Sequence, residues 1–118
     1  MTPESSSMTP WRKLAPIFGD RLMSRLLGVS RRSVARYRSG ERRTPEVVGA
    51  RLNRHARVVH HLEGAYNALG VRRWFQRRRS ALDGKSPADV LAGAWDPTAA
   101  ESQSVLALAR SLSGLGAT

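Results

Sequence analysis

The chain has 118 residues, 41% of them hydrophobic, which accommodates one ordinary domain or two small ones. It contains no cysteine, which excludes disulfides and thiolate metal sites and makes the reducing cytoplasm the expected compartment. No apolar run approaches the roughly 20 residues of a membrane span, and the N-terminus lacks the basic-then-apolar order of a signal peptide.

Positive charge is concentrated in the first two thirds of the chain. The net charge is +11, from 20 Lys and Arg against nine Asp and Glu. Eighteen of the 20 basic residues lie between Trp11 and Arg79, together with only four acids. A solvated arginine-rich surface is the alternative interpretation, but this crowding favours a polyanionic partner for the basic part.

In chain order, residues 1–8 are predicted to form a disordered leader, with Met1 and Met8 as alternative starts. Thr9 and Pro10 are a cap and first-turn pair that predicts a helix. The apolar face of this helix comprises Trp11, Leu14, Ile17 and Phe18. Gly19 is expected to end it.

The segment from Leu22 to Tyr37 is predicted to be a helix-turn-helix. Gly28 lies where the chain must turn with a positive φ, which glycine adopts at little cost. Ser24 is small enough to let the second helix approach closely, and Ser30 is a good N-cap for that helix. The apolar residues that would seal the two helices together are Met23, Leu26, Leu27, Val29, Val34 and Tyr37.

The outward face of the second helix, which Ser39 and Gly40 close, carries the residues predicted to contact DNA. Arginines on adjacent outward turns suit bidentate pairing with guanine in a major groove. Arginines at the helix end and in the following link suit phosphates, as does Arg51 further along. The predicted DNA-binding residues are Ser30, Arg31, Arg32, Ala35, Arg36, Arg38, Arg42 and Arg43.

One long amphipathic helix is expected from about Pro45 to about Leu69, with Thr44 as its cap and Gly70 at its end. Its apolar residues recur at helical spacing and are Val48, Leu52, Val59, Leu62, Tyr66 and Leu69. Such a helix predicts either a spine that joins two halves or a dimer seam.

Short helices and turns are expected after Gly70. Their signals are Trp74, Phe75 and Leu82 for a short helix, Asp83-Gly84 for a turn, Ser86-Pro87 for a helix that Gly93 ends, and Asp96-Pro97 for the last helix. The last helix carries an apolar stripe of Val105, Leu108, Ala109 and Leu112, and the final SGLGAT has no strong helix signal. The predicted fold is therefore all-α: an N-terminal helix-turn-helix bundle joined by a long helix to a small helical C-terminal domain.

Enzymatic chemistry finds little support in the sequence. No two of the histidines share a helix face as a metal site requires, so surface or phosphate-facing positions are expected for His55, His60 and His61. The carboxylates that recur near the C-terminus stand at turns or helix starts, where they cap: Asp83, Asp89 and Asp96. No phosphate loop or nucleophile motif occurs, so no enzyme, metal or cofactor is expected.

The run from Trp74 to Leu91 resembles the signature of the MbcA/ParS/Xre antitoxin family. The C-terminal toxin-binding domain of that family carries a Trp, a leucine-x-glycine, a Ser-Pro start and a leucine-rich helix. The matching residues here are Trp74, Leu82, Gly84, Ser86, Pro87 and Leu91. A closing helix and a glycine are matched by residues 105–108 and Gly114, and an Xre-like helix-turn-helix precedes the domain, so the resemblance covers nearly the whole chain.

The resemblance implies an antitoxin of a type II toxin–antitoxin system. Such a protein neutralises a RES-domain toxin, an enzyme that degrades NAD⁺, by covering its active site, and represses its own operon. The implied organisation is a helix-turn-helix domain with its connecting helix at 9–70 and a toxin-binding domain at 71–118, in a homodimer that forms higher hetero-oligomers with the toxin. The expected toxin contacts are Trp95, Arg110, Leu112, Gly114, Leu115 and Thr118.

Two other functions remain open at this point. In a stand-alone helix-turn-helix regulator, residues 80–118 would merely complete a dimer core, although the change of charge at Ser80 argues against that. An RNA-binding protein would also explain the arginines but would not need the turn at Gly28. The toxin substrate, the operator and the stoichiometry are not readable from the sequence.

Overall fold

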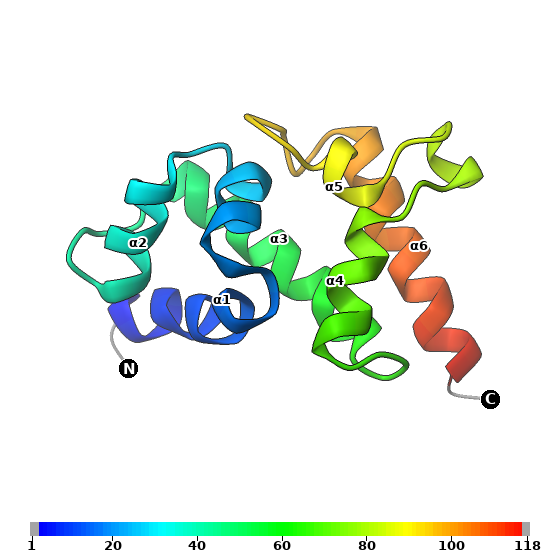
Figure 1. Ribbon diagram of the computed structural model, residues 1–118, viewed down its shortest axis with the longest axis horizontal. Helices are drawn as coiled ribbons and strands as arrows, with labels where there is room; N and C mark the ends of the chain where they lie inside the picture. Colours follow the sequence, from blue (N-terminus) through cyan, green and yellow to red (C-terminus); the bar gives the residue numbers. More distant parts are fainter. Residues whose placement is uncertain (1–2, 117–118) are drawn as a thin grey trace.

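The computed structural model describes the backbone of residues 3–116 and the side chains of residues 9–112. Six α-helices lie in that part of the chain, with one short 3-10 turn between the fourth and the fifth (Figure 1). Their bounds are α1 Pro3–Leu27, α2 Arg31–Ser39, α3 Glu46–Leu62, α4 Ala68–Gln76, η1 Ser80–Leu82, α5 Pro87–Val90 and α6 Ala100–Gly116. The described backbone forms no strand, only an isolated bridge between Arg79 and Lys85, so the all-α prediction is confirmed.

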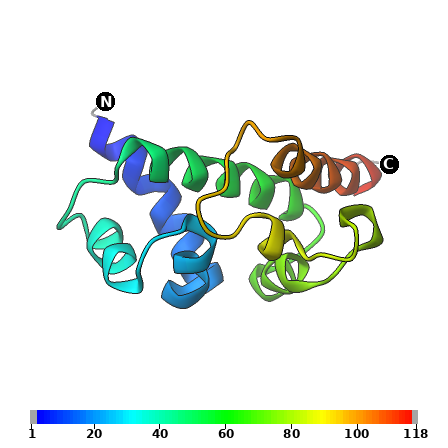
Figure 2. The same cartoon turned by 90° about the horizontal axis from the view of Figure 1, so that it is seen from above.

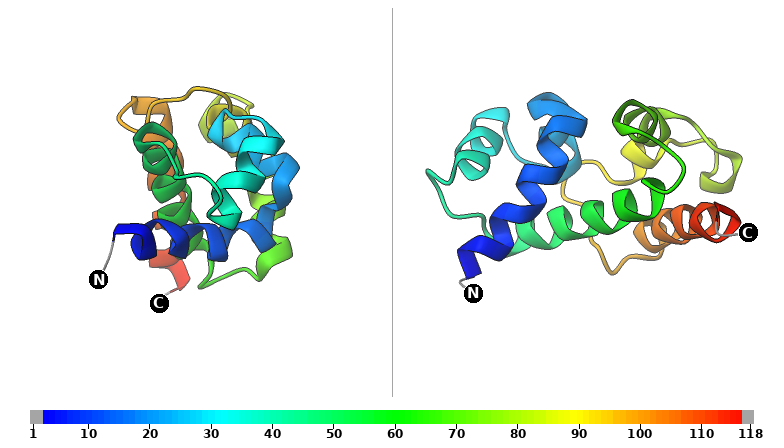
Figure 3. Two further views of the ribbon diagram at one scale, coloured as in Figure 1. Left: turned by 90° about the vertical axis from the view of Figure 1, so that its left-hand side faces the viewer. Right: turned by 90° about the horizontal axis from the view of Figure 1, so that it is seen from below.

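Helix α3 is the spine of the molecule. It packs against α1 at one end and against α6 at the other (Figure 2). Helix α2 packs against α1, and α4 packs against α5. Helices α3 and α6 lie along one side, and α2 and α4 lie on the opposite side (Figure 3, right). The spine interpretation of the third helix is therefore confirmed, and the interpretation as a dimer seam stays a prediction.

Helix α1 consists of two arms that meet at Gly19. The backbone of Gly19 has φ 75° and ψ 164°, which no helix contains, so the chain changes direction there as predicted. The first arm buries Trp11, Leu14 and Phe18 completely. It begins at Pro3, before the start at Pro10 that the sequence predicted, so residues 3–8 of the predicted leader have helical backbone.

The start of α3 differs from the predicted cap. Pro45 itself occupies the N-cap position, and no side chain caps the helix. The Thr44 hydroxyl instead accepts a hydrogen bond from the Trp11 indole N–H at 2.9 Å, which ties the loop after α2 to the first arm of α1. The Thr44 hydroxyl, which the sequence predicted to cap α3, therefore forms a tertiary hydrogen bond with Trp11.

The predicted long helix is wrong beyond Leu62. Helix α3 ends there, and α4 starts after a short loop that contains Gly64. Asn67 caps α4 because its side-chain oxygen accepts the Gly70 N–H at 2.9 Å, so Gly70 belongs to a helix start and not to a helix end. Tyr66 and Leu69, which continued the apolar pattern, are exposed.

The C-terminal part follows its turn signals more closely. Asp83 and Gly84 turn the chain with φ 56° and 81°, as predicted. Ser86 caps α5 in a capping box with Asp89. The last helix starts at Ala100, later than predicted, and continues through Gly116, so the expectation of no helix in the final residues is wrong as far as that residue.

A single hydrophobic cluster runs through both halves of the chain. It contains Leu14 and Leu26 from α1, Leu52 from α3, Phe75 from α4 and Val105 from α6. The apolar stripe of α6 packs on α3, with Val105 and Ala109 fully buried. The helix-turn-helix and the C-terminal part therefore share one core.

Candidate nucleic-acid interface

The turn between the second arm of α1 (residues 20–27) and α2 has the predicted geometry. Gly28 has φ 70°, and its N–H and that of Val29 both donate to the Ser24 carbonyl, at 3.0 and 3.2 Å. The Ser24 hydroxyl donates back to the Val29 carbonyl. The small residue and the glycine thus close the turn jointly.

A second constraint on Gly28 could not be read from the sequence. A Cβ built on this residue would lie 2.2 Å from the carbonyl oxygen of Gly93, which belongs to the loop between α5 and α6. Gly28 therefore lacks a side chain for two reasons, its left-handed backbone and the close approach of another backbone.

Both ends of α2 carry their predicted caps. The Ser30 side chain accepts the Ser33 N–H at 3.0 Å, and Gly40 adopts φ 82° and donates to the Tyr37 carbonyl at 3.2 Å. Val34 and Tyr37 are buried against α1. This burial fixes which face of α2 points away from the protein.

The predicted DNA contacts lie at three kinds of position. Arg31, Arg32, Arg42 and Arg43 are exposed on α2 and the following loop, whereas Ala35 and Arg36 are half-buried. Arg38 is exposed but forms an ion pair with Asp20, in which Nε and Nη2 donate to the two carboxylate oxygens at 3.1 and 2.9 Å. Arg38 therefore fastens α2 to the start of the second arm of α1.

The C-terminal end of α1 is capped by groups from distant parts of the chain. The last carbonyls of a helix have no partner within the helix. Here the Arg25 carbonyl accepts the Gly93 N–H at 3.0 Å, and the Leu26 carbonyl accepts the Trp95 indole N–H at 2.7 Å and lies 2.8 Å from His55 Nε2. The helix that leads into the turn is therefore terminated by α3 and by the loop that precedes α6.

Arg51 also belongs to this cap. Its guanidinium donates to the Leu27 carbonyl at 3.0 Å and to the Trp95 carbonyl at 2.9 Å. The structure commits two of its N–H groups to main-chain acceptors, so Arg51 has a structural role, and its predicted phosphate contact stays a prediction. We name the four residues 51, 55, 93 and 95 the α1 cap.

His55 lies in the interior, so the prediction of a surface or phosphate-facing position for this histidine is wrong. Its ring is completely buried between Phe75 and Trp95, with centroids 6.0 and 5.0 Å away. Burial lowers the pKa of His55 to about 4, although the hydrogen bond to Leu26 opposes the effect. The imidazole is therefore neutral, and its Nε2 donates to the Leu26 carbonyl while Nδ1 has no partner among the described residues.

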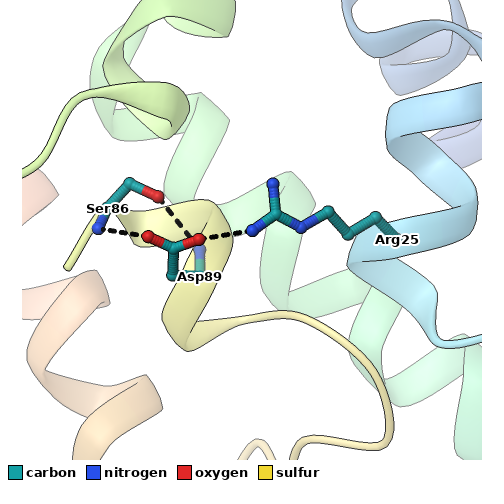
Figure 4. A network of polar contacts seen from close by, with 3 residues as sticks. All are labelled: Arg25, Ser86 and Asp89. Atoms are coloured by element: carbon teal, nitrogen blue, oxygen red, sulfur yellow. Dashed lines mark hydrogen bonds and ion pairs between the residues drawn. The ribbon is translucent and has the colours of Figure 1, made fainter.

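A second polar link joins the helix-turn-helix to α5 (Figure 4). The Arg25 guanidinium donates to the Asp89 carboxylate, whose other oxygen accepts the Ser86 N–H at 3.0 Å. The Ser86 amide first, and then the Ser86 hydroxyl and Arg25, lower the pKa of Asp89. The predicted capping carboxylate thus also anchors α5 to α1.

Most of the residues that carry the family resemblance lie in the core or at the start of a helix. Trp74, Leu82 and Leu91 are buried core residues, and Ser86 with Pro87 starts α5. The Arg79 guanidinium lies over the Trp74 ring, 4.7 Å from its centre.

The predicted toxin contacts that the structure describes differ in exposure. Trp95 is buried in the α1 cap, so its indole is not available to a partner. Arg110 is exposed and Leu112 half-buried on α6. Gly114 and Leu115 lie in the last turns of α6, and Thr118 lies outside the described residues.

No described group of three or more His, Cys, Asp or Glu side chains is arranged to hold a metal ion. None of the helices over residues 3–116 has the length and apolarity that crossing a bilayer requires. Comparison with protein-family models, curated proteins and solved structures finds no match to this chain.

Proposed function

We propose that this protein binds duplex DNA through α2 and is the antitoxin of a two-gene operon, which it represses while neutralising a RES-domain toxin. The observation that carries the DNA-binding part is the presentation of α2. A capped helix of nine residues follows a tight turn, with Val34 and Tyr37 inward and Arg31 and Arg32 exposed at its start.

The electrostatics of this region support duplex DNA as the partner. Recognition helices contact base edges mainly through their N-terminal residues, which here are Arg31 and Arg32. Arg42 and Arg43 in the following loop are exposed and free of ion pairs within the described residues, so they suit phosphates. Because Arg38 is paired with Asp20, it contributes to the placement of α2.

Substitution on α2 tests the DNA-binding proposal. Arg32→Ala or Arg36→Ala should weaken binding to the DNA upstream of the gene by about 1–3 kcal/mol if the side chain pairs with a base, and should relax sequence preference. Titration of this DNA and of an unrelated duplex measures both effects. Arg78→Ala, which removes an exposed charge outside the helix-turn-helix, is the matched control.

Two results would contradict this assignment. Equal losses on both duplexes would reduce Arg32 and Arg36 to phosphate contacts. Binding that does not weaken with salt would remove the electrostatic argument altogether, since each phosphate contact contributes a slope of about −0.9 in log K against log salt.

The antitoxin part of the proposal is supported by the resemblance over residues 74–91 and by the position of α6. This helix ends the described chain and leaves Arg110 exposed beside the half-buried Leu112. The residues that follow would extend this helix or tail toward the NAD⁺ cleft of a toxin.

Deletion of Gly114–Thr118 tests the toxin interaction. Because the deletion spares the buried α6 residues Val105, Leu106 and Ala109, the truncated protein should keep its fold and its DNA affinity while neutralising the toxin less well. Growth on co-expression with the neighbouring gene product measures neutralisation. Rescue equal to that of the full chain would mean that the tail is not a plug and that inhibition comes from the helices alone.

A stand-alone regulator is the second candidate. The α1 cap favours it, because residues 93 and 95 complete the helix-turn-helix and so give the C-terminal part a structural role without any toxin. A RES-type reading frame beside this gene, and growth rescue by this protein, would distinguish an antitoxin from such a regulator.

A further inference from the structure

A second basic region lies away from α2, in a groove between α3 and α6. Arg54 and Arg57 on α3 and Arg110 on α6 line this groove, which has a volume of about 550 Å³. The two helices that form it run along the side of the molecule opposite to α2 and α4 (Figure 3, right). Three guanidinium groups are thus brought together from segments more than 50 residues apart.

These arginines have no anionic partner within residues 9–112. Elsewhere the protein pairs cations with carboxylates, as in Lys13 with Glu63 at 3.3 Å, but no ion pair among the described residues includes a groove arginine. Nη1 of Arg54 is buried and has no hydrogen-bond acceptor. A buried guanidinium N–H without a partner is unfavourable unless a ligand supplies the acceptor.

The local electrostatics show the same lack of anions. Burial lowers the pKa of Arg54, and the charges of Arg57 and Arg110 lower it further. The pKa of the neighbouring His61 is lowered by burial first, and then by Arg110, His60 and Arg57. Cations that repel one another in this way would gain from a shared anion.

The basic region is elongated. A second hollow, lined by Arg57, His60 and His61 with Asn53 and Ala56, adjoins the groove and shares Arg57 with it. From Arg54 to His61 the row extends roughly 10 Å along α3, at about 1.5 Å per residue. That length is enough to contact more than one phosphate of a strand, whose charges follow one another at about 3.4 Å of rise along the duplex axis.

We propose that this groove binds the sugar–phosphate backbone of a nucleic acid, as a second site independent of α2. An acidic protein segment fits less well, because protein interfaces use buried apolar or aromatic anchors. The large exposed apolar side chains of the described part are Val47, Tyr66 and Leu69, and none of them lines the groove or the adjoining hollow. Protein–DNA interfaces are instead strongly basic and polar.

The placement of the groove determines what it could bind. A straight duplex seated on α2 lies on the opposite side from α3 and α6, so the groove would contact a second duplex or a bent continuation of the first. This site does not depend on base readout by α2, and it can be tested in protein that lacks such readout.

The test uses the full chain carrying Arg32→Ala and Arg36→Ala, with a duplex of unrelated sequence as the probe. Adding Arg54→Gln, Arg57→Gln and Arg110→Gln should make the slope of log K against log salt shallower by about 2–3, as expected for the loss of two or three phosphate contacts. The matched control adds Arg12→Gln, Arg73→Gln and Arg77→Gln, which remove three exposed charges outside the groove and should change the slope by less than 1.

An unchanged slope in the groove variant, or equal changes in groove and control variants, would overturn the proposal. Loss of polyglutamate binding without a change in the DNA slope would identify an acidic protein as the occupant and would overturn it as well. If the triple variant loses its cooperative melt, the exposed Arg57→Gln alone should still make the slope shallower by about 0.9.

Discussion

At the scale of single residues, His55 shows how burial converts a titratable group into a fixed hydrogen-bond donor. Its neutral ring places a donor on the last turn of α1, where a carbonyl lacks a helical partner. Arg51 lies beside it and donates one N–H to the Leu27 carbonyl at the same helix end and another to the Trp95 carbonyl. The sequence predicts surface or phosphate-facing positions for both side chains, yet each donates a hydrogen bond to a carbonyl at the end of α1.

Stability should therefore depend on pH through His55. Its pKa is about 4 in the folded protein and 6.5 ordinarily, so between these values the unfolded chain binds more protons. The free energy of unfolding should fall by about 3 kcal/mol as the pH drops from 6.5 to 4. Denaturant unfolding across this range measures the effect. The lowered pKa values of Asp89 and Asp96 act only at lower pH.

Two histidine substitutions identify which residue causes the pH dependence of stability. His55→Gln keeps an N–H donor for the Leu26 carbonyl but does not titrate, so it should remove most of the change in stability between pH 4 and 6.5 and leave the smaller contribution of His61, whose pKa is also lowered. His60→Gln alters an exposed ring and should leave the curve unchanged. A flat curve in the wild-type protein would show that the buried imidazole does not control stability.

At the scale of elements, the turn between α1 and α2 depends on a contact that its own segment does not contain. Gly28 and Gly40 both have positive φ, but only a Cβ on Gly28 would collide with other atoms. The carbonyl of Gly93 lies against the turn and its N–H caps α1. The angle between the two helices is thus supported from outside the motif.

Alanine at these two glycines should separate backbone strain from the close approach. Gly40→Ala should lower the free energy of unfolding by about 1–2 kcal/mol, the cost of a left-handed residue with a side chain. Gly28→Ala should lower it by about 3 kcal/mol or more, because the loop at residue 93 must also move. Urea denaturation measures both. Equal losses of unfolding free energy in the two variants would mean that the loop at residue 93 moves away at no measurable cost.

Local signals predicted the all-α fold, the turn at Gly28 and the caps at Ser30, Gly40 and Ser86, because each of these depends on residues a few positions apart. Tertiary partners decided the rest. The apolar pattern did not distinguish a continuing helix from a loop at Tyr66, since exposed and buried apolar residues share the same spacing. No local pattern could locate the partner of Arg51, which lies 44 residues away.

At the scale of the whole molecule, the two predicted domains behave as one packed unit. The hydrophobic cluster is continuous from α1 to α6, and the α1 cap and the Arg25–Asp89 pair cross between the halves. The loop between α5 and α6 contacts the end of α1, the helix that precedes α2. A partner that docks on α5 or α6 would therefore act on residues that contact this helix end.

Truncation should show this dependence. A chain that ends at Arg78 keeps α1 to α4 but loses residues 93–95 and the α6 stripe, so it should lose its cooperative melt and its DNA binding. A chain that ends at Leu112 keeps the cap and should melt like the full protein. Circular dichroism melts and DNA titration measure both. A sharp melt and full DNA affinity in the shorter chain would show that the helix-turn-helix is autonomous.

The distance along the chain between the end of α1 and its cap also orders events during translation. Leu26 is made 69 residues before Trp95, which at about 5–20 residues per second is an interval of roughly 3 to 14 seconds. Throughout that interval the Arg25 carbonyl lacks its Gly93 partner and the Leu26 carbonyl lacks the Trp95 indole. Arg51 and His55 are made earlier and can already donate to the Leu27 and Leu26 carbonyls. A nascent or prematurely terminated chain therefore lacks part of the α1 cap, and under the proposed function only copies that include residues 93–95 would present the completed turn to DNA.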